Sequence, residues 1–496
     1  MRKKRKVVRL ISQFICIIAL IVMVVFLVLL RKLNVLPMKF FIPITGVLCF
    51  LEFIYILFCL KKRTKIGILI FFDFFAIIFI ILEFFASTKI HATDKFLDEV
   101  KVKETRDAYY LVVNSESEYK KLDSIKNKIV YYFDDGSNYD NLKNQILNDV
   151  KVLFTETNNC SELMDSVIKD KTKIILISDS SYNAYFEKEE EDSEEKDKNN
   201  TNTEEDLKKE FRILKEYELV EKIEVSETNK DITSEPFIIY LSGIDTRKNK
   251  MPSRSLSDVN MYLVVNPKNR KILMVSIPRD YYVKIHGKTG LNDKLTHAGI
   301  IGGVKLSKAT IKDLLGIEAD YYVRLNFNAV IKLVDTIGGI TVNSDVKYSF
   351  KCWTDRSCVI HPGDNKLNGK CALAFARERH AYKSGDRHRG ENQQQVIKKV
   401  FNKITSSKTL ISKYEKILDS LKGTFETDLS TDNITSLIQF QLNDMKGWNF
   451  ETYNLDGNTG MDYTYSYPNR KLSIMYQNPE TVKEAQKRIN QVLNEK

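Results

Sequence analysis

Charged residues in the C-terminal half of this sequence stand in clusters at the ends of apolar runs. Three of the clusters are GIDTR, SDVNM and SIPRD, which contain Asp245, Asp258, Arg279 and Asp280. Each cluster borders a run with a strand pattern, FIIYLSGI, VNMYLVV or KILMVSI, so the charges should gather at a sheet edge. Carboxylates and guanidinium groups brought together in this way suit an anionic phosphoryl group, which binds arginine forks or a divalent metal.

A fourth cluster, ARERHAYKSGDRHRGENQ, occupies residues 376–393. Arg377 and Arg379 are two residues apart, a spacing that aligns side chains on an extended segment but separates them on a helix. If the helix predicted for LNGKCALAFA stops near Ala376, both guanidinium groups point the same way. The other candidates here are Asp386 as a brace, Arg387 or Arg389 as an anion ligand at the start of the next helix, and Gln393 on the face of Arg389.

Ordinary structural roles compete with this chemistry. The two strand-end aspartates could cap turns, Arg279 could simply pair with Asp280 or Asp258, and the fourth cluster could be a solvated basic loop. His297 and His380 are given no catalytic role, because lone histidines are more often structural. The sequence has no GxSxG, Walker or HExxH motif, so serine and zinc hydrolases lack support.

The elements that must position these clusters follow from residue 236 onward. Apolar periodicity predicts helices at 306–315, 328–337, 367–376 and 389–404, and a strand at 320–327. Amphipathic patterns predict further helices at 412–423, 432–445 and 480–493, with a strand at 449–455. We expect an α/β domain over 236–496, with a mixed central β-sheet flanked by helices on both faces.

Residues 99–235 predict a separate, small α/β accessory domain. Short apolar runs such as AYYLVVN and KIILIS alternate there with polar, helix-forming stretches. The stretch 187–206 is dominated by acids and has no aromatic or aliphatic residue, so it cannot bury a core and is expected to be a disordered loop. No chemistry is assigned to this domain.

Three apolar stretches within residues 1–92 predict an α-helical membrane anchor. LISQFICIIALIVMVVFLVLL, FFIPITGVLCFLEFIYILFCL and IGILIFFDFFAIIFIILEFFA each approach the ~20 apolar residues needed to cross a bilayer. The basic segments MRKKRK and KKRTK should lie in the cytoplasm by the positive-inside rule. A multi-pass protein of the cell membrane, with its large soluble part on the extracytoplasmic side, is the expectation.

The basic balance of the chain does not predict a nucleic-acid partner. The sequence has 76 Lys and Arg against 65 Asp and Glu, a formal charge of +11. Part of this excess flanks the apolar stretches, and no helix-turn-helix, zinc-finger or RNA-binding signature is present. Anionic lipids and envelope polymers fit the charge better.

Two of the seven cysteines, Cys352 and Cys358, flank WTDRS at a predicted hairpin tip. They are close enough in sequence for a local disulfide in an oxidising exterior, although free thiols remain an alternative. Metal binding by this pair is not expected, because the spacing is not CxxC and no second pair follows.

Taken together, these motifs resemble the LytR-CpsA-Psr family. The resemblance covers residues 236–496 and rests on GIDTR, SDVNMYLVVNPKNRKILMVSIPRDYYVKI, DKLTHAGI, DYYVRLNFNAVIKLVDTIGGI, LNGKCALAFARERH and GDRHRGENQ. Three membrane spans and an accessory domain are similar to the capsule-type, CpsA-like members. One position departs from the family pattern: an arginine usually stands two residues before the SDxxM aspartate, where this chain has Leu256, and Arg254 is a candidate replacement.

The resemblance implies a metal-dependent phosphotransferase that acts as a peptidoglycan ligase. It would transfer a glycopolymer, capsular polysaccharide or teichoic-acid-like, from a polyprenyl pyrophosphate carrier to peptidoglycan and release polyprenyl phosphate. The carrier tail needs an apolar slot, for which Val330, Leu333 and Leu373 are candidates if they are not simply core. The implied Mg²⁺ or Mn²⁺ ligands are Asp245 and Asp258; the implied catalytic residues are Asp258, Arg279, Arg377, Arg379 and Arg389; the implied substrate contacts are Asp280, Asp386, Arg387 and Gln393.

The implied partners are the lipid-linked glycan, peptidoglycan and capsule-assembly proteins of a Gram-positive-type envelope. Two other functions stay open. A polyprenyl pyrophosphate phosphohydrolase would share the site but transfer to water, and a membrane-bound, non-enzymatic regulator of envelope assembly would not need the converging charges.

Overall fold

A computed structural model of the chain describes every residue except 1, 35, 63, 102–103, 136, 158, 187–206, 223–225, 227, 229, 246–250, 384, 407–412, 414–415 and 496. The acidic loop expected at 187–206 therefore lies outside the described residues. The chain forms two compact units. Met1–Val102, Thr405–Lys422 and Ser430–Gly447 make the first, and Lys103–Ile404, Gly423–Leu429 and Trp448–Lys496 make the second. The division into 1–92, 99–235 and 236–496 stays a prediction.

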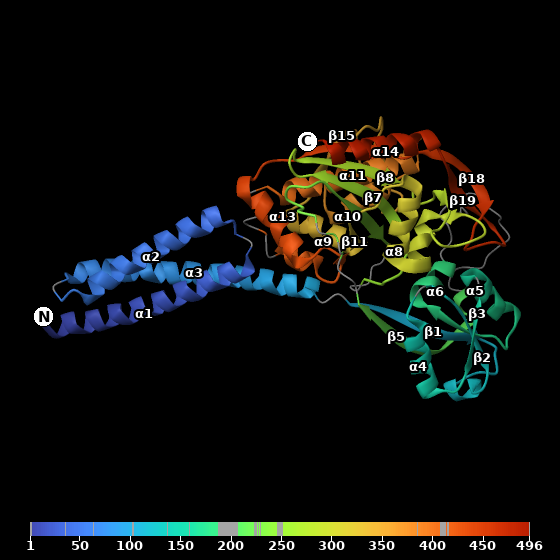
Figure 1. Ribbon diagram of the computed structural model, residues 1–496, viewed down its shortest axis with the longest axis horizontal. Helices are drawn as coiled ribbons and strands as arrows, with labels where there is room; N and C mark the ends of the chain where they lie inside the picture. The colour runs from blue at the N-terminus through green and yellow to red at the C-terminus, as the bar shows by residue number, and fades with distance from the viewer. Residues whose placement is uncertain are drawn as a thin grey trace. The chain divides into compact units, whose positions relative to one another are not determined.

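The first unit is built from long helices (Figure 1). Helices α1 (Arg2–Leu33), α2 (Met38–Leu60) and α3 (Ile66–Lys101) supply three stretches that are long and apolar enough to cross a membrane, as predicted. Helix α13 (Thr431–Asp444) belongs to the same unit. Its residues Ile434 and Ile438 pack, with Leu418, against Phe26 and Ile90. The apolar face predicted at 432–445 therefore finds its partners among the N-terminal helices.

The second unit begins with a five-stranded mixed sheet in the order β3-β2-β4-β1-β5. We call residues 104–222 the accessory lobe. Leu142 and Ile146 pack on one side of its sheet, and Leu163 and Val167 belong to a second apolar cluster. This arrangement confirms the predicted small α/β fold. Its elements are β1 (Glu104–Asn114), η1 (Leu122–Ile125), β2 (Ile129–Phe133), α4 (Tyr139–Asp149), β3 (Leu153–Thr157), α5 (Cys160–Lys169), β4 (Ile174–Ser178), α6 (Asp179–Phe186) and β5 (Phe211–Lys222).

A mixed six-stranded sheet lies at the centre of the rest of the second unit, in the order β16-β11-β6-β7-β8-β17. Strands β6, β7 and β8 are antiparallel, whereas β11 is parallel to β6 and β17 is parallel to β8. The predicted mixed sheet is confirmed. Its strands are β6 (Phe237–Ile244), β7 (Ser257–Asn266), β8 (Lys271–Ile277), β11 (Tyr321–Asn326), β16 (Phe425–Thr427) and β17 (Asn449–Asn454).

Helices cover both faces of this central sheet. Helices α8 (Leu295–Leu315) and α14 (Pro479–Asn494) share one apolar cluster with Tyr240, Tyr262 and Val275. Helices α9 (Phe327–Ile337), α10 (Gly369–Arg377) and α11 (Asp386–Ile404) lie on the other face, near Leu241 and Val259. Alternate residues of β6 and β7 therefore serve opposite layers, as expected for strands buried on both sides.

Apolar packing continues from the central sheet into the accessory lobe. One cluster of buried residues contains Leu163 of the accessory lobe together with Ile277 and Leu295. A polar contact supports the same junction, because the Ser253 N–H donates to Asp107 Oδ1 at 2.8 Å. The accessory lobe is thus packed directly against the part of the chain that carries the charged clusters.

Four short strand pairs complete the second unit. The pair β18–β19 follows the last strand of the central sheet and was not predicted from the sequence, which lacks strong apolar runs there. These pairs are β9 (Tyr282–Val283) with β10 (Asp293–Lys294), β12 (Ile340–Ser344) with β15 (Gly363–Leu367), β13 (Phe350–Lys351) with β14 (Val359–Ile360), and β18 (Gly457–Tyr463) with β19 (Lys471–Gln477).

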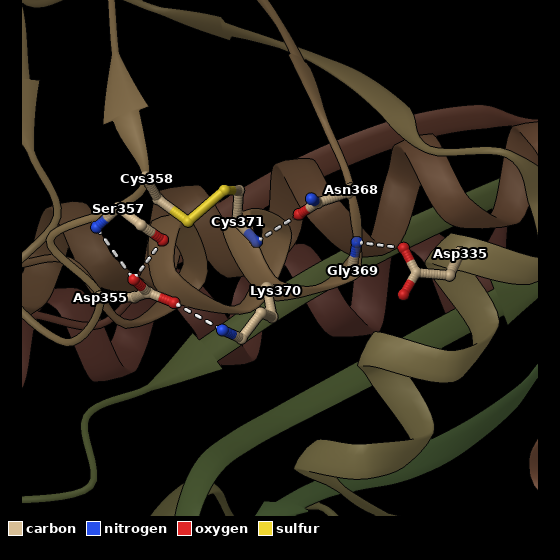
Figure 2. Close-up of a disulfide and its surroundings, with 8 residues drawn as sticks. All are labelled: Asp335, Asp355, Ser357, Cys358, Asn368, Gly369, Lys370 and Cys371. Atoms are coloured by element: carbon tan, nitrogen blue, oxygen red, sulfur yellow. Dashed lines mark hydrogen bonds and ion pairs between the residues drawn. A yellow bond between two sulfur atoms is a disulfide. The ribbon is translucent and has the colours of Figure 1, made fainter.

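A disulfide joins Cys358 to Cys371 in the first turn of α10 (Figure 2). The predicted pairing of Cys352 with Cys358 is wrong. The Cys352 N–H does donate to the Cys358 carbonyl at 2.9 Å, but Cys352 is a buried free thiol. The Asn368 side chain caps α10 by accepting from the Cys371 N–H at 2.9 Å, and the helix start that it fixes brings Cys371 to the hairpin.

Candidate active site

Asp258 and Arg279 meet at one edge of the central sheet. Asp258 is the second residue of β7 and Arg279 lies two residues beyond β8, and these antiparallel strands bring the start of one beside the end of the other. Arg279 Nη1 donates to Asp258 Oδ1 at 2.8 Å, and Arg279 Nε lies 3.5 Å from Asp280 Oδ2. Both ion pairs considered as ordinary roles are therefore present, and they hold the guanidinium in place.

Asp280 acts as a buried brace. Its Oδ1 lies 2.8 Å from Lys294 Nζ, and both side chains are almost fully buried. Burial alone would raise the pKa of Asp280, but Lys294, Arg279 and Arg389 lower the pKa of this carboxyl well below its usual range. Asp280 is therefore a permanent anion behind Arg279. Among the described residues it does not line either cavity beside the site.

Arg377 and Asp245 form a second ion pair next to the first. Arg377 ends α10 and Asp245 follows β6, and Arg377 Nη2 donates to Asp245 Oδ2 at 3.2 Å. The Arg377 guanidinium carbon also lies 4.7 Å from the ring centroid of Phe327, a cation–π contact that orients the side chain. The Arg377 side chain is thus held by the Asp245 carboxylate and the Phe327 ring.

Arg379 and Arg389 approach a different carboxylate. Arg389 Nη1 lies 3.0 Å from Asp386 Oδ1, and Arg379 Nη1 lies 4.0 Å from the same oxygen. Helix α10 does end close to Ala376, as predicted, yet Arg377 and Arg379 reach separate acids. Burial lowers the pKa of the Arg389 guanidinium and raises the pKa of the Asp386 carboxyl. A further anion beside Arg389 would therefore be favourable.

Arg387 and Gln393 occupy different environments. The Arg387 side chain is 53% exposed and lies 3.5 Å from Glu391 and 3.4 Å from Asp456. It is not brought to the other predicted residues. Gln393 lies on the same face of α11 as Arg389, and both residues line the apolar cavity described next.

Two cavities meet at Asp258, Arg279 and Arg377. The polar cavity has a volume of about 440 Å³, and the apolar cavity has a volume of about 90 Å³. All three residues line both cavities, so the charged groups stand at the junction. Val330 and Leu373, named from the sequence as candidates for an apolar slot, line the apolar cavity, but Leu333 does not. The other apolar residues there are Leu241, Val259, Leu325, Phe327, Ala376, Val396 and Ile397.

The donor set fits a divalent cation that is shared with a phosphate. Asp245 and Asp258 both line the polar cavity, and both carboxylates are already bound by an arginine. No group of three or more His, Cys, Asp or Glu side chains gathers as a metal site within the described part of the chain. Mg²⁺ commonly takes one or two carboxylates and completes its shell with water and phosphate oxygens, which matches this pair.

Lys294 and His297 also line the polar cavity, although neither was selected as a site residue from the sequence. Both belong to the DKLTHAGI motif, which was the available signal. His297 Nδ1 lies 2.6 Å from Asp293 Oδ1, so the imidazole is oriented by a buried acid. Burial raises the pKa of Asp293, but His297 and Ser466 lower the pKa of this carboxyl more, to below its ordinary value.

Accessory-lobe residues and the loop 464–470 form the rest of the polar cavity. From the accessory lobe come Phe133, Asn159, Ser161 and Tyr185, among others. Burial raises the pKa of the Cys160 thiol to about 12, which makes this cavity residue a poor nucleophile at neutral pH. The loop, between β18 and β19, contributes Tyr465, Ser466, Tyr467 and Arg470.

Arg254 does not take the place of the arginine missing at Leu256. Arg254 is 6% exposed, and its Nε donates to the Asp135 carbonyl at 3.0 Å. Its Nη1 lies 3.5 Å from Glu221 Oε2. Leu256 itself lines the polar cavity. Arg254 is thus a buried link to the accessory lobe, and an apolar side chain stands where the family pattern has a guanidinium.

Comparison with known proteins gives matches across the same region. The LytR_cpsA_psr family model matches residues 183–485, more than half of the 496 residues. The chain is 36% identical over 211 residues to "Polyisoprenyl-teichoic acid–peptidoglycan teichoic acid transferase TagU" of Bacillus subtilis (strain 168), covering 42% of this chain and 64% of that protein. It is 34% identical over 223 residues to the protein of the same name from Enterococcus faecalis (strain ATCC 700802 / V583), covering 45% and 71%.

A relative with a different name matches at a similar level. "Biofilm regulatory protein A" of Streptococcus mutans serotype c (strain ATCC 700610 / UA159) is 34% identical over 220 residues, covering 42% of this chain and 54% of that protein. The chain thus spans between about half and seven tenths of the length of these relatives. Among solved structures, protein gbs0355 from Streptococcus agalactiae has a TM-score of 0.47 and 28% identity, covering 55% of this chain and 92% of that one. TagV of B. subtilis has a TM-score of 0.44 and 25% identity, covering 53% and 99%.

Proposed function

We propose, from the premise that this chain belongs to the LytR_cpsA_psr family, that it transfers a glycopolymer from a polyprenyl pyrophosphate carrier to peptidoglycan. Relatives named as polyisoprenyl-teichoic acid–peptidoglycan teichoic acid transferases support this reaction class. Capsular polysaccharide and teichoic acid are both within the proposal. The soluble part would work on the extracytoplasmic side of the cell membrane, where its substrates meet.

The observation that carries the proposal is the junction of the two cavities at Asp258, Arg279 and Arg377. A polyprenyl pyrophosphate glycan is apolar at one end, doubly charged in the middle and polar at the other end. The apolar cavity suits the first isoprene units, the arginines suit the pyrophosphate and the polar cavity suits the sugars. A regulator without catalytic activity would not need an apolar cavity, a cluster of arginines and a polar cavity in this sequence.

In the proposed reaction, a hydroxyl oxygen of peptidoglycan attacks the phosphorus on the glycan side of the pyrophosphate. A new P–O bond forms, the bridging P–O bond breaks, and polyprenyl phosphate leaves with the electron pair. The hydroxyl proton passes to Asp258 or Asp245, the carboxylates that face the polar cavity. Arg279, Arg377 and Arg389 hold the phosphoryl oxygens and stabilise the charge that develops on them.

Asp245 and Asp258 would hold a divalent cation together with the pyrophosphate. The cation would neutralise phosphoryl charge, as metals do in other phosphoryl transfers. Asp280 keeps Arg279 charged and in place, and Asp386 does the same for Arg389. These two acids are proposed as positioning residues.

The disulfide supports the extracytoplasmic placement. Disulfides persist in oxidising surroundings and are rare in the cytosol of ordinary bacteria. Cys358 and Cys371 lie in the same unit as the candidate active site, so the bond and the site share one compartment.

The test is an assay with full-length protein in detergent micelles, a polyprenyl pyrophosphate glycan, Mg²⁺ and peptidoglycan fragments. Transfer gives a covalent glycan–peptidoglycan conjugate and polyprenyl phosphate in equal amounts. We expect this product, and we expect EDTA to abolish it and added Mg²⁺ to restore it. Release of free phosphorylated glycan instead would identify a phosphohydrolase. Binding of the lipid without turnover would favour a regulator.

A further inference from the structure

The polar cavity has one wall that belongs to the accessory lobe. Tyr185 and Phe133 supply rings there, and Asn159 and Ser161 supply polar groups at the start of α5. Asp258, Arg279 and Arg377 line the same cavity. A lobe that the sequence linked to no chemistry thus forms part of the reaction cavity.

This wall is tied to the loop 464–470 by direct hydrogen bonds. Asn159 Nδ2 donates to the Tyr465 carbonyl at 2.5 Å, and Ser161 Oγ donates to the Ser466 carbonyl at 2.7 Å. Asn159 Oδ1 also caps α5 by accepting from the Ser161 N–H at 2.9 Å. The Asn159 side chain therefore caps the start of α5 and, together with Ser161, fixes the loop 464–470.

The loop is also anchored from the catalytic side. The Ser466 N–H donates to Asp293 Oδ2 at 2.8 Å, while Asp293 Oδ1 orients His297. The Tyr467 ring lies 5.7 Å from the His297 ring and carries the Arg470 guanidinium carbon 4.4 Å from its centroid. The cavity surface from the accessory lobe to His297 is consequently one connected structure.

Aromatic faces beside short polar groups are the surface that a pyranose ring binds. The C–H face of a sugar packs on a ring, and its hydroxyls exchange hydrogen bonds with amides, hydroxyls and guanidinium groups. The Tyr185 hydroxyl is already engaged with Asp165 Oδ1 at 2.6 Å, and its ring packs edge-on against Phe186, with centroids 5.3 Å apart. The ring is thus pre-positioned, which lowers the entropic cost of binding.

We propose that the accessory lobe supplies a sugar-binding subsite, in which Tyr185, Asn159 and the loop 464–470 hold the pyranose next to the phosphoryl junction. This rests on the proposed function, since it assigns the sugar side of the same substrates. The pyranose belongs either to the glycan of the donor or to the peptidoglycan acceptor. Both present the same chemistry, a pyranose ring with an apolar C–H face and polar hydroxyls.

The test measures binding, so it does not depend on turnover. Full-length protein in detergent micelles is titrated with geranylgeranyl pyrophosphate, with the same lipid carrying one N-acetylglucosamine, and with a peptidoglycan disaccharide-peptide. For Tyr185→Ala we expect Kd to rise roughly tenfold for the sugar-bearing lipid or for the disaccharide-peptide. The Kd for the sugar-free lipid should stay within about twofold, because that ligand does not reach this wall. The ligand that weakens identifies the source of the sugar.

Two further variants keep the result interpretable. Tyr185→Phe retains the ring and should bind sugar almost as wild type does. Tyr131→Ala removes another partly buried tyrosine of the accessory lobe that does not line the cavity, and it should leave every Kd unchanged. Equal losses for the sugar-free and sugar-bearing lipids, or no loss for any ligand, would overturn the subsite. If wild type binds sugar in this way but makes no conjugate, the proposed transfer fails while the subsite stands.

Discussion

Arg377 is expected to contribute much to catalysis and little to the stability of the fold. It borders both cavities, bonds Asp245 and stacks on Phe327, yet about a quarter of its side chain remains exposed. A partly exposed ion pair contributes little to stability, about 0–1 kcal/mol. Its effect on a phosphoryl group in the cavity should be much larger.

Arg377→Ala should therefore lower kcat/KM for conjugate formation about 100-fold or more, because one preorganised cation is lost from the transition state. The unfolding temperature should change little. Arg356→Ala is the matched control, since Arg356 also lies over an aromatic ring, that of Trp353, but lines neither cavity. Similar activity losses for the two variants would contradict the assigned role of Arg377.

A second residue-scale expectation concerns pH and Asp293. Its pKa in the folded protein is lower than in the unfolded chain, where an aspartate has a pKa of about 3.9. The carboxylate therefore contributes stability above about pH 4, and this contribution is lost as the pH falls through the folded-state pKa. Asp293→Asn should lower the unfolding temperature at pH 7, and the difference from wild type should shrink by pH 3. Thermal melts at both pH values test this, and a constant difference would refute it.

Residues also show where sequence reasoning succeeds and fails. The Asp258–Arg279 contact could be predicted, because strand ends of known polarity must meet at a sheet edge. Tyr185 and Asn159 could not be predicted, because their place in the cavity depends on how one lobe packs on another. The predicted partner of Cys358 was wrong for a related reason. Nearness in sequence favoured Cys352, but the folded chain places Cys371, in the first turn of α10, beside Cys358.

At the scale of elements, α10 links the disulfide to the active site. Its first turn carries Cys371 and its last residue is Arg377. The Gly369 N–H at its start donates to Asp335 Oδ1 at 2.7 Å. Figure 2 marks this hydrogen bond with a dashed line. Any change that moves this short helix should also displace Arg377.

Loss of the disulfide should destabilise the protein without removing a catalytic group. Closing a loop of 13 residues is worth roughly 3 kcal/mol when estimated from chain entropy. Cys371→Ser should lower the unfolding temperature and make it insensitive to reductant. Cys352→Ser, the control, should keep the sensitivity because Cys352 is a free thiol. A reductant effect that persists in Cys371→Ser would show that another bond is responsible.

Gly369 should tolerate no side chain. A Cβ at this position would lie 2.2 Å from the Ile331 carbonyl oxygen, a backbone atom that cannot rotate away. We expect Gly369→Ala to push α10 off α9, at a cost of about 1–3 kcal/mol, and to reduce transfer through displacement of Arg377. Gly447→Ala, where a Cβ meets nothing within 4 Å, is the comparison. Wild-type stability and activity for Gly369→Ala would rule out this coupling.

At the scale of the whole molecule, the apolar helices and the flanking basic residues set the expected orientation. Cysteine labelling in intact cells can test it, in a background where the native free cysteines are replaced by serine. Lys62→Cys, in the loop before α3, should resist a membrane-impermeant maleimide. Tyr348→Cys should react, because Tyr348 is 83% exposed and belongs to the unit proposed to lie outside. The opposite labelling pattern would reverse the topology.

Sequence periodicity gave the element types over most of the chain but not every assignment of element to unit. The helix patterns at 432–445 and 480–493 look alike, since both alternate apolar and polar residues over a similar length. One packs within the unit of the N-terminal helices, and the other covers the central sheet. An amphipathic pattern predicts that the apolar face of a helix is buried, but it does not identify the element that packs against that face.

The grouping of 405–422 and 430–447 with the N-terminal helices has a practical outcome for the preparation of this protein. A trimmed, water-soluble version that starts at residue 103 would retain Leu418, Ile434 and Ile438 but lose Phe26 and Ile90, against which they pack. These apolar side chains would then be exposed to water, and we expect the shortened protein to aggregate. The protein should therefore be purified with its N-terminal helices intact, in a nanodisc.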